Sequence, residues 1–285
     1  MNNNYEDHNK EKAIYKHYPG SERVIVFIHG IIEGPKQFRR LAQIAYKLGY
    51  AINILLLPGH GGNGHIFART SYKQWVNYVS RQVKQMKAQY KEVILVGHSM
   101  GALLTLCEAV ANDNKIIAIV LMDIPIKVHL WPRVIEGAIK IGVGDIKPWE
   151  GYTRAEYGAI SVGRTSILGY LGWLDRYCEL FTLIRYSKKQ IHKIQIPILL
   201  VFANKDEFVS LKSKRYFENN SFVMQEVILE DSGHFCYNHH DLVKLEKVFK
   251  DFIRAEKKKI NRVNVYKKYK QNNEYKKTTL SKIRR

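Results

Sequence analysis

Short apolar runs alternate along the chain with longer segments of mixed polarity. The runs are rich in Val, Ile and Leu, end in turn residues, and predict buried strands at residues 23–28, 51–57, 92–96, 116–121, 196–202 and 225–229. Because apolar residues occupy both faces of these runs, they are typical of parallel strands covered on both sides. Helix-forming segments lie between them, among them residues 37–48, 71–88 and 103–111. This alternation predicts an α/β fold with a doubly wound, mostly parallel sheet.

The alternation stops between residues 126 and 193, where no buried strand is evident. This segment is broken by several glycines and is rich in aromatic residues, namely Trp131, Trp149, Tyr152, Tyr157, Tyr170, Trp173, Tyr177 and Phe181. Such an insertion predicts a helical cap over the sheet edge at which ligands bind, with an apolar pocket beneath it. Alternatively, the aromatic side chains pack the cap against the core. We therefore expect a core of residues 1–125 and 194–255 and a cap of residues 126–193.

Composition sets the broad class of the protein. With 285 residues, 46% of them hydrophobic, the chain can bury the core of one α/β domain. Its 3 cysteines are far apart and odd in number, which argues against a disulfide framework and favours a reducing compartment. The amino-terminal segment is polar, and no apolar run approaches the length of a membrane span. We expect a soluble, cytoplasmic protein.

The net charge of +20 is unevenly distributed, because residues 254–285 contain thirteen Lys or Arg and two Glu. The sequence predicts a basic tail at residues 256–285. It is either a solvated, partly disordered extension or a peripheral contact with anionic membrane. No segment resembles a recognised nucleic-acid module, so nucleic acid is not an expected partner.

The first candidate for chemistry is the pentapeptide Gly-His-Ser-Met-Gly at residues 97–101, which directly follows a predicted strand and precedes a predicted helix. Turning from strand to helix within a few residues brings backbone segments into near contact, which favours glycine at both ends of the motif. Ser99 then lies at the tip of the turn, where its hydroxyl can act as a nucleophile.

A serine hydroxyl needs a base to take its proton and an acid to orient that base. Asp206 follows the strand predicted at 196–202, and His234 follows the next one. The loops after parallel strands converge on one edge of the sheet, so Ser99, Asp206 and His234 are expected to meet there. Asp123 and Asp231 are rivals for the acid: Asp123 follows the preceding core strand, and Asp231 is close to His234 but is better suited to shaping the loop.

These motifs, taken in order, resemble the alpha/beta-hydrolase superfamily, and within it the monoacylglycerol lipase, lysophospholipase and small carboxylesterase group. The matching segments cover most of the chain and read His-Gly at 29–30, Leu-Pro-Gly-His-Gly at 57–61, the motif at 97–101, Asn-Lys-Asp at 204–206 and Ser-Gly-His at 232–234. The basic tail has no counterpart in this resemblance.

The resemblance implies an alpha/beta-hydrolase fold with a helical cap. It makes Ser99 the nucleophile, His234 the general base and then acid, and Asp206 the residue that fixes the imidazole tautomer. It also assigns the oxyanion hole to the backbone N–H groups of Ile31 and Met100. No cofactor and no metal are expected.

Three further histidines, His29, His60 and His98, are interpreted as loop or core-packing residues, because none has the spacing of a metal site.

The expected function is that of a serine ester hydrolase acting on a small-molecule acyl ester such as a monoacylglycerol or a lysophospholipid. The same triad serves acyltransferases, thioesterases and hydrolases of other bonds, and the fold alone does not separate them. A non-catalytic module that binds lipid or nucleic acid is an alternative from a different class.

Overall fold

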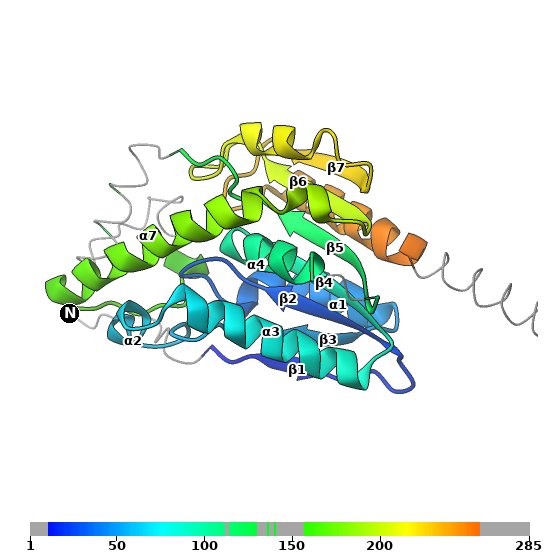
Figure 1. Ribbon diagram of the computed structural model, residues 1–285, viewed down its shortest axis with the longest axis horizontal. Helices are drawn as coiled ribbons and strands as arrows, with labels where there is room; N and C mark the ends of the chain where they lie inside the picture. Colours follow the sequence, from blue (N-terminus) through cyan, green and yellow to red (C-terminus); the bar gives the residue numbers. More distant parts are fainter. Residues whose placement is uncertain (1–10, 112–113, 130–135, 137–139, 141–156, 257–285) are drawn as a thin grey trace, which may run out of the picture.

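The computed structural model describes residues 11–111, 114–129, 136, 140 and 157–256, and the sheet that these residues form has seven strands (Figure 1). Their order across the sheet is β1-β3-β2-β4-β5-β6-β7. The strands are β1 (Ile14–Lys16), β2 (Arg23–Ile28), β3 (Ala51–Ile54), β4 (Glu92–His98), β5 (Ile116–Met122), β6 (Ile198–Ala203) and β7 (Val223–Leu229). Only β1 runs antiparallel to its neighbour within this sheet. The doubly wound, mostly parallel sheet is therefore confirmed.

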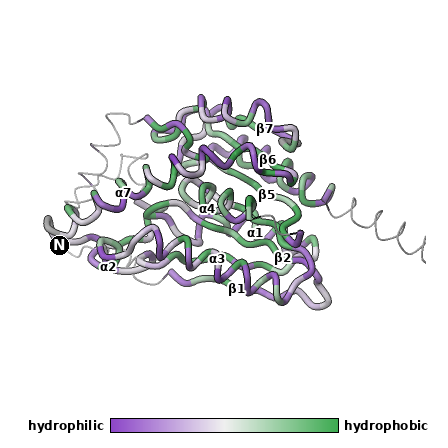
Figure 2. The backbone as a smooth tube through the Cα atoms, viewed as in Figure 1, coloured by the Kyte–Doolittle hydropathy of each residue, from purple (hydrophilic) through white to green (hydrophobic). Residues whose placement is uncertain are grey.

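Alternate residues of the central strands face two separate hydrophobic cores. In β2, Val24, Val26 and Ile28 pack with the helices on one face, while Ile25 and Phe27 pack on the other. All five are fully buried, as expected for a strand covered on both sides. The hydrophobic colouring of β2 and β5 in Figure 2 marks the same layer.

Helices cover both faces of the sheet. The first core includes side chains of α3 (Tyr72–Gln89), α4 (Met100–Ala109) and α7 (Ile167–Lys188). The second core includes side chains of α1 (Arg39–Lys47) and of the helix over residues 239–256. The three-layer arrangement brings the carboxyl ends of the parallel strands to one edge.

Local sequence explains where α1 and α3 begin. Ser71 caps α3 and forms a capping box with Gln74, in which each side chain accepts from the other residue's backbone N–H. The helix predicted at 37–48 divides into the 3-10 turn η2 (Pro35–Phe38) and α1. Proline suits the first position of such a turn because it needs no N–H partner there.

The helix α7, which lies in the predicted cap, packs against the short helix α2 (Gly64–Ala68) of the expected core. The indole nitrogen of Trp173 donates to the carbonyl of Gly64 at 3.1 Å, and its ring packs on Phe67 with 4.9 Å between centroids. At least this aromatic residue therefore ties the cap to the core. The expected cap residues Trp131, Trp149 and Tyr152 lie outside the described residues.

The remaining elements are short and close the carboxyl-terminal half of the chain. Among them are the 3-10 turns η3 (Ile191–Lys193) and η4 (Leu211–Phe217). The predicted basic tail at 256–285 lies outside the described residues except for Glu256. In the described part, no helix is long and apolar enough to cross a membrane. All three cysteines fall within that part and are free thiols.

Candidate active site

Ser99 occupies the turn between β4 and α4 in a strained conformation. Its φ is 53° and its ψ is −122°, a region that costs free energy for any residue with a side chain. The backbone N–H of Ser99 donates to the carbonyl of Met122 at 2.9 Å, which fixes the turn to the end of β5. Such a sharp, strained strand-to-helix turn is the setting in which a serine hydroxyl is presented for attack.

The two glycines that flank this turn are required by contact. A Cβ at Gly97 would lie 2.3 Å from the carbonyl oxygen of Gly101, and one at Gly101 would lie 2.0 Å from that of Ile28. Both separations are far below van der Waals contact. Backbone segments therefore lie in near contact at this turn, as expected, and β2 is one of them.

His234 is paired with Asp206. Its Nδ1 lies 2.6 Å from Asp206 Oδ2, while Oδ1 of the same carboxylate accepts from the backbone N–H of Phe208 at 2.7 Å and of Val209 at 2.6 Å. Because an ionised carboxylate only accepts hydrogen bonds, Nδ1 carries the proton and Nε2 is left to act as a base.

Burial and charge act in opposite directions on this pair. Burial disfavours both charged forms, but the attraction and hydrogen bond between the two side chains lower the pKa of Asp206 and raise the pKa of His234. The N–H groups of Val209 and Phe208 lower the pKa of Asp206 further. The pair is therefore biased toward an anionic aspartate beside an imidazole that gains a proton readily.

The rings around His234 join it to the serine turn. Its imidazole lies 4.7 Å from that of His98, the residue before Ser99, and 5.1 Å from the ring of Phe208, measured between centroids. The loops of Ser99, Asp206 and His234, which follow β4, β6 and β7, thus lie at the carboxyl edge of the sheet. Asp206 and His234 are hydrogen-bonded, and contact of Ser99 with this pair stays a prediction.

Asp231, one rival for the acid, lies on the surface. Its side chain pairs with Lys205 at 2.6 Å, and its backbone N–H donates to the carboxylate of Asp241 at 2.7 Å. Asp241 also accepts from the hydroxyl of Ser232, two residues before His234. These contacts agree with the interpretation that Asp231 shapes the histidine loop.

Asp123, the other rival, is buried beside the pair. Its Oδ1 accepts from the backbone N–H of Ala203 at 2.7 Å, and its Oδ2 lies 3.5 Å from Nε2 of His98. Burial, together with the charge of Asp206, raises the pKa of Asp123. The hydrogen bond to the His234 ring is made by Asp206 and not by Asp123. The geometry therefore favours Asp206 as the acid.

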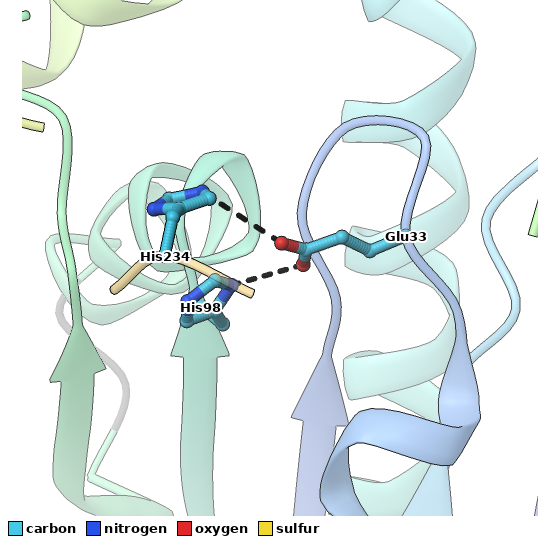
Figure 3. A group of neighbouring side chains, drawn as sticks. All are labelled: Glu33, His98 and His234. Carbon is cyan, nitrogen blue, oxygen red and sulfur yellow. Dashed lines mark hydrogen bonds and ion pairs between the residues drawn. The ribbon is translucent and has the colours of Figure 1, made fainter. Parts of the chain in front are cut away.

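Sequence reasoning assigned no role to Glu33, yet this residue is central to the site. It lies in the loop after β2, and its side chain is almost fully buried. Its Oε2 accepts from the backbone N–H of Gly30 at 2.7 Å and from Nδ1 of His98 at 2.9 Å, while Oε1 lies 3.7 Å from Nε2 of His234 (Figure 3). One carboxylate therefore touches two imidazoles.

His98 consequently departs from the packing role expected of it. Although burial disfavours its charged form, the charge of Glu33, the nearby carboxyl of Asp123 and the hydrogen bond with Glu33 raise the pKa of His98 to about 10. His98 is thus an imidazolium at neutral pH, held between two carboxylates.

His29 and His60 agree with the loop and packing interpretation. His29 accepts from the N–H of Leu57 at 3.0 Å, and His60 accepts from the N–H of Ile32 at 3.1 Å. Burial lowers the pKa of His29 to about 4 and the pKa of His60 well below its usual value, so both are neutral. Each histidine therefore holds a loop at the edge of the sheet through a hydrogen bond from the loop's backbone.

The loop expected to carry an oxyanion donor lies against Ser99. A Cβ at Gly30 would be 2.9 Å from the Cβ of Ser99, so the next residue, Ile31, begins its path beside the serine. Met100 is the first residue of α4, where the N–H groups of a helix have no partners within the helix. The segments that carry both expected donors thus lie beside Ser99, and their role as the oxyanion hole stays a prediction.

Ser161, a residue of the predicted cap, supports this loop. The backbone N–H of Ser161 donates to the carbonyl of Ile32 at 2.8 Å, and its hydroxyl donates to the carbonyl of Glu33. Ser161 is fully buried.

Two groups of side chains here have spacings that a metal ion could bridge. Glu33, His98 and His234 form one, and Asp123, Asp206 and His234 form the other, with the potential ligand atoms of each group within 4.8 Å of one another. In both groups, however, atoms of opposite charge already pair: His98 with Glu33, and His234 with Asp206. The arrangement is that of a hydrogen-bonded charge cluster.

A serine on a strained strand-to-helix turn, at the carboxyl edge of a doubly wound sheet, is the architecture of an α/β hydrolase. The model of the alpha/beta hydrolase family matches residues 25–244, and the chain belongs to this family.

Individual relatives point in the same direction. The chain is 26% identical over 239 residues to a monoglyceride lipase homolog of monkeypox virus, which covers 78% of this chain and 85% of the viral protein. Among solved structures, the fold is similar to that of LipS and LipT, two metagenome-derived lipolytic enzymes, with a TM-score of 0.66, 18% identity and coverage of 86% and 97%. It is also similar to a monoacylglycerol lipase of Paleococcus ferrophilus, with a TM-score of 0.63, 18% identity and coverage of 87% and 99%.

Proposed function

We propose that this protein is a serine hydrolase that cleaves carboxylic acyl esters through an acyl-enzyme intermediate. The observation that carries the proposal is the 2.6 Å hydrogen bond between His234 Nδ1 and Asp206, formed beside the strained turn of Ser99. A nucleophile, a base and an acid that orients the base are the minimum set for acyl transfer.

In the first half of the reaction, Ser99 Oγ attacks the ester carbonyl carbon while its proton passes to His234 Nε2. Asp206 keeps the other ring nitrogen protonated and stabilises the imidazolium that forms. The negative charge on the carbonyl oxygen is met by the backbone N–H groups of Ile31 and Met100, each of which contributes a few kcal/mol, roughly, to lowering the barrier. The intermediate then collapses, and the alcohol leaves with the proton from Nε2.

In the second half, a water molecule gives its proton to His234 Nε2 and attacks the acyl group on Ser99. The collapse of this second intermediate returns the proton to Ser99 Oγ and releases the carboxylic acid. Water is therefore the only co-reactant, and the residues end in their starting protonation states.

For the substrate we propose a lipid-like ester such as a monoacylglycerol or a lysophospholipid. The relatives named above that carry lipase names support this class. A second support is the apolar character of the cap: Leu171, Leu174 and Phe181 of α7 are exposed large apolar side chains. An acyl chain presents a matching surface.

The test is a comparison of Ser99→Ala with Ser80→Ala, a control that removes an exposed hydroxyl from α3. Ser99→Ala should lose hydrolysis of a monoacylglycerol and covalent labelling by a fluorophosphonate, while its thermal unfolding stays cooperative. Ser80→Ala should behave like the wild type. Turnover that survives in Ser99→Ala would overturn the proposal.

A substrate series then decides the ester class. Monoacylglycerols and lysophospholipids with chains from four to about eighteen carbons, a matched thioester, and an alcohol acceptor in place of water cover the chemistries that the same triad supports. A rise of kcat/KM with chain length in the oxygen esters supports a lipid-like substrate. Faster thioester cleavage or a dominant transfer product would contradict it.

A further inference from the structure

The strongest feature that the proposed reaction does not use is the carboxylate of Glu33. Its side chain is 1% exposed, although an ionised carboxylate is costly to bury without partners. Oε2 has two donors, the N–H of Gly30 and Nδ1 of His98. Oε1 has no hydrogen-bond partner among the described residues. The carboxylate is therefore fixed at one oxygen and available at the other.

The available oxygen faces the catalytic side of His234. Oε1 lies 3.7 Å from Nε2, the nitrogen that exchanges the proton with Ser99 in the proposed reaction (Figure 3). Asp206 holds the opposite nitrogen, Nδ1. The imidazole thus lies between two carboxylates, one on each ring nitrogen.

His98 keeps Glu33 ionised. The burial that would favour a protonated carboxyl is outweighed by the charge of His98, its hydrogen bond and the charge of His234, so the pKa of Glu33 lies below its usual value. His98 also prevents the carboxylate from turning fully toward His234, because it holds Oε2.

We propose, on the basis of the serine-hydrolase function above, that Glu33 is a positioning residue: it places a negative charge opposite Nε2 of His234 and stabilises the imidazolium that forms when Ser99 gives up its proton. It does not take the proton itself, because Nε2 must return that proton to the leaving alcohol.

The other charged groups facing His234 act from separate loops, and Glu33 can be distinguished from them. Asp206 is hydrogen-bonded to Nδ1, and the charge of His98 opposes a second positive charge nearby. Glu207 accepts from the backbone N–H of His234 at 2.9 Å, away from the ring. Asp123 also has a carboxylate oxygen within 4.8 Å of a ring nitrogen of His234, but its side chain pairs with Nε2 of His98 at 3.5 Å. Of the described carboxylates, Glu33 is the one whose oxygen pairs with Nε2.

The test uses Glu33→Gln, which keeps the shape of the side chain and one acceptor oxygen for Gly30 but removes the charge. Glu92→Gln is the matched control: Glu92 pairs with Arg23 at the opposite end of β4. The pKa of His234 is read from the pH titration of its ring protons by NMR, assigned by their loss in His234→Ala. This measurement does not require activity.

In Glu33→Gln the pKa of His234 should fall by about one unit, a tenfold change in its proton affinity, because the carboxylate opposite Nε2 no longer favours the charged ring. The acid limb of fluorophosphonate labelling should move to lower pH by the same amount, and its plateau rate should fall about tenfold because a less basic imidazole is a weaker base. Glu92→Gln should leave both unchanged. Glu33→Asp, which keeps the charge, should retain most of the wild-type pKa.

Several results would overturn this role. An unchanged pKa of His234 in a folded Glu33→Gln protein is one, and a raised KM with an unchanged acid limb, which would place Glu33 against the substrate, is another. If the variant does not fold, the titration of His234 in Asp206→Asn decides, because the raising effect of Asp206 is then removed: a His234 pKa at or below 6.5 contradicts the proposal, and a higher one supports it. If the wild type does not react with the fluorophosphonate, the serine-hydrolase function fails, and this role fails with it. If it labels normally while the His234 pKa ignores Glu33, only the further inference fails.

Discussion

The hydroxyl of Ser161 donates a hydrogen bond to the main-chain carbonyl of Glu33 and so joins the cap to the loop beside Ser99. Removing it in Ser161→Ala should lower the free energy of unfolding by about 1 kcal/mol and reduce kcat several-fold, because the loop of Ile31 would lose a fixed contact. Steady-state kinetics and urea unfolding measure both effects. Ser210→Ala is the control. It removes the side chain that accepts from the backbone N–H of Lys212 at the start of η4, so it should lower stability without changing kcat. A Ser161→Ala protein with reduced stability but unchanged kcat would show that the hydrogen bond from Ser161 to Glu33 does not hold the loop for catalysis.

The three candidate acids should differ in rank. Asp206→Asn should reduce kcat roughly 10³- to 10⁴-fold, because an amide that donates to Nδ1 stabilises the wrong tautomer of His234. Asp231→Asn removes only an exposed ion pair with Lys205 and should change kcat less than about twofold. Asp123→Asn keeps an acceptor for Ala203 and should fall between them. If Asp123→Asn lowers kcat more than Asp206→Asn does, Asp123 is the acid.

The neutral state of His29 predicts a loss of stability in mild acid. Burial lowers the pKa of His29 to about 4. Below about pH 6.5 this imidazole is therefore protonated in the unfolded chain but stays neutral in the folded chain. The free energy of unfolding should then fall by about 1.4 kcal/mol per pH unit for this residue, with a similar contribution from His60. His98 and His234, whose pKa values are raised, contribute in the opposite direction near pH 6.5, and this contribution levels off at lower pH as histidines of the unfolded chain become protonated.

Urea unfolding between pH 6.5 and 5 measures this slope while most carboxyl groups remain ionised. His29→Gln should be less stable at pH 7 but should show a smaller slope, because this imidazole is removed. Equal slopes in the variant and the wild type would mean that His29 is protonated in the folded state.

Gly101→Ala should disable the serine turn. The added Cβ would lie 2.0 Å from the carbonyl oxygen of Ile28, so β2 and α4 must separate or the protein must unfold. The expected result is loss of fluorophosphonate labelling together with a lower Tm. Gly62→Ala is the control, because the space around that glycine is open. Full labelling of Gly101→Ala would contradict the close approach.

The parts of the fold that sequence predicted well are those with a single dominant signal. Residues 23–28 form β2 as predicted, because an uninterrupted apolar run is compatible only with burial on both faces. The start of α3 was within one residue, because Ser71 and Gln74 form a capping box. The strand predicted at 51–57 ends at Ile54, because the following apolar residues belong to the loop that His29 and His60 hold.

Two elements had weaker signals. β1 has only three residues and is half-exposed at the sheet edge, so its sequence carries no clear alternation. The length of α7 could not be predicted for a different reason. Leu183 is buried, but Leu171 and Leu174 are more than half exposed, so the sequence of this helix has no single apolar stripe.

The site divides in the same way. Ser99, Asp206 and His234 were predicted to meet because each follows a strand of one parallel sheet. Glu33 has no such signal, since its importance depends on a loop that folds back on Gly30 and points the carboxylate toward His98. A buried glutamate cannot be recognised from its neighbours in sequence when the partners that neutralise it are far along the chain.

Three residues other than glycine have positive φ angles in the described part of the chain, namely Ile32, Ser99 and Asp123, and each follows a central strand. Every one of these conformations costs about 1 to 3 kcal/mol. Glycine at position 99 would relieve that strain and also remove the proposed nucleophile. Selection for thermal stability alone would therefore favour variants that lack catalytic activity. Only simultaneous selection for activity would retain the serine.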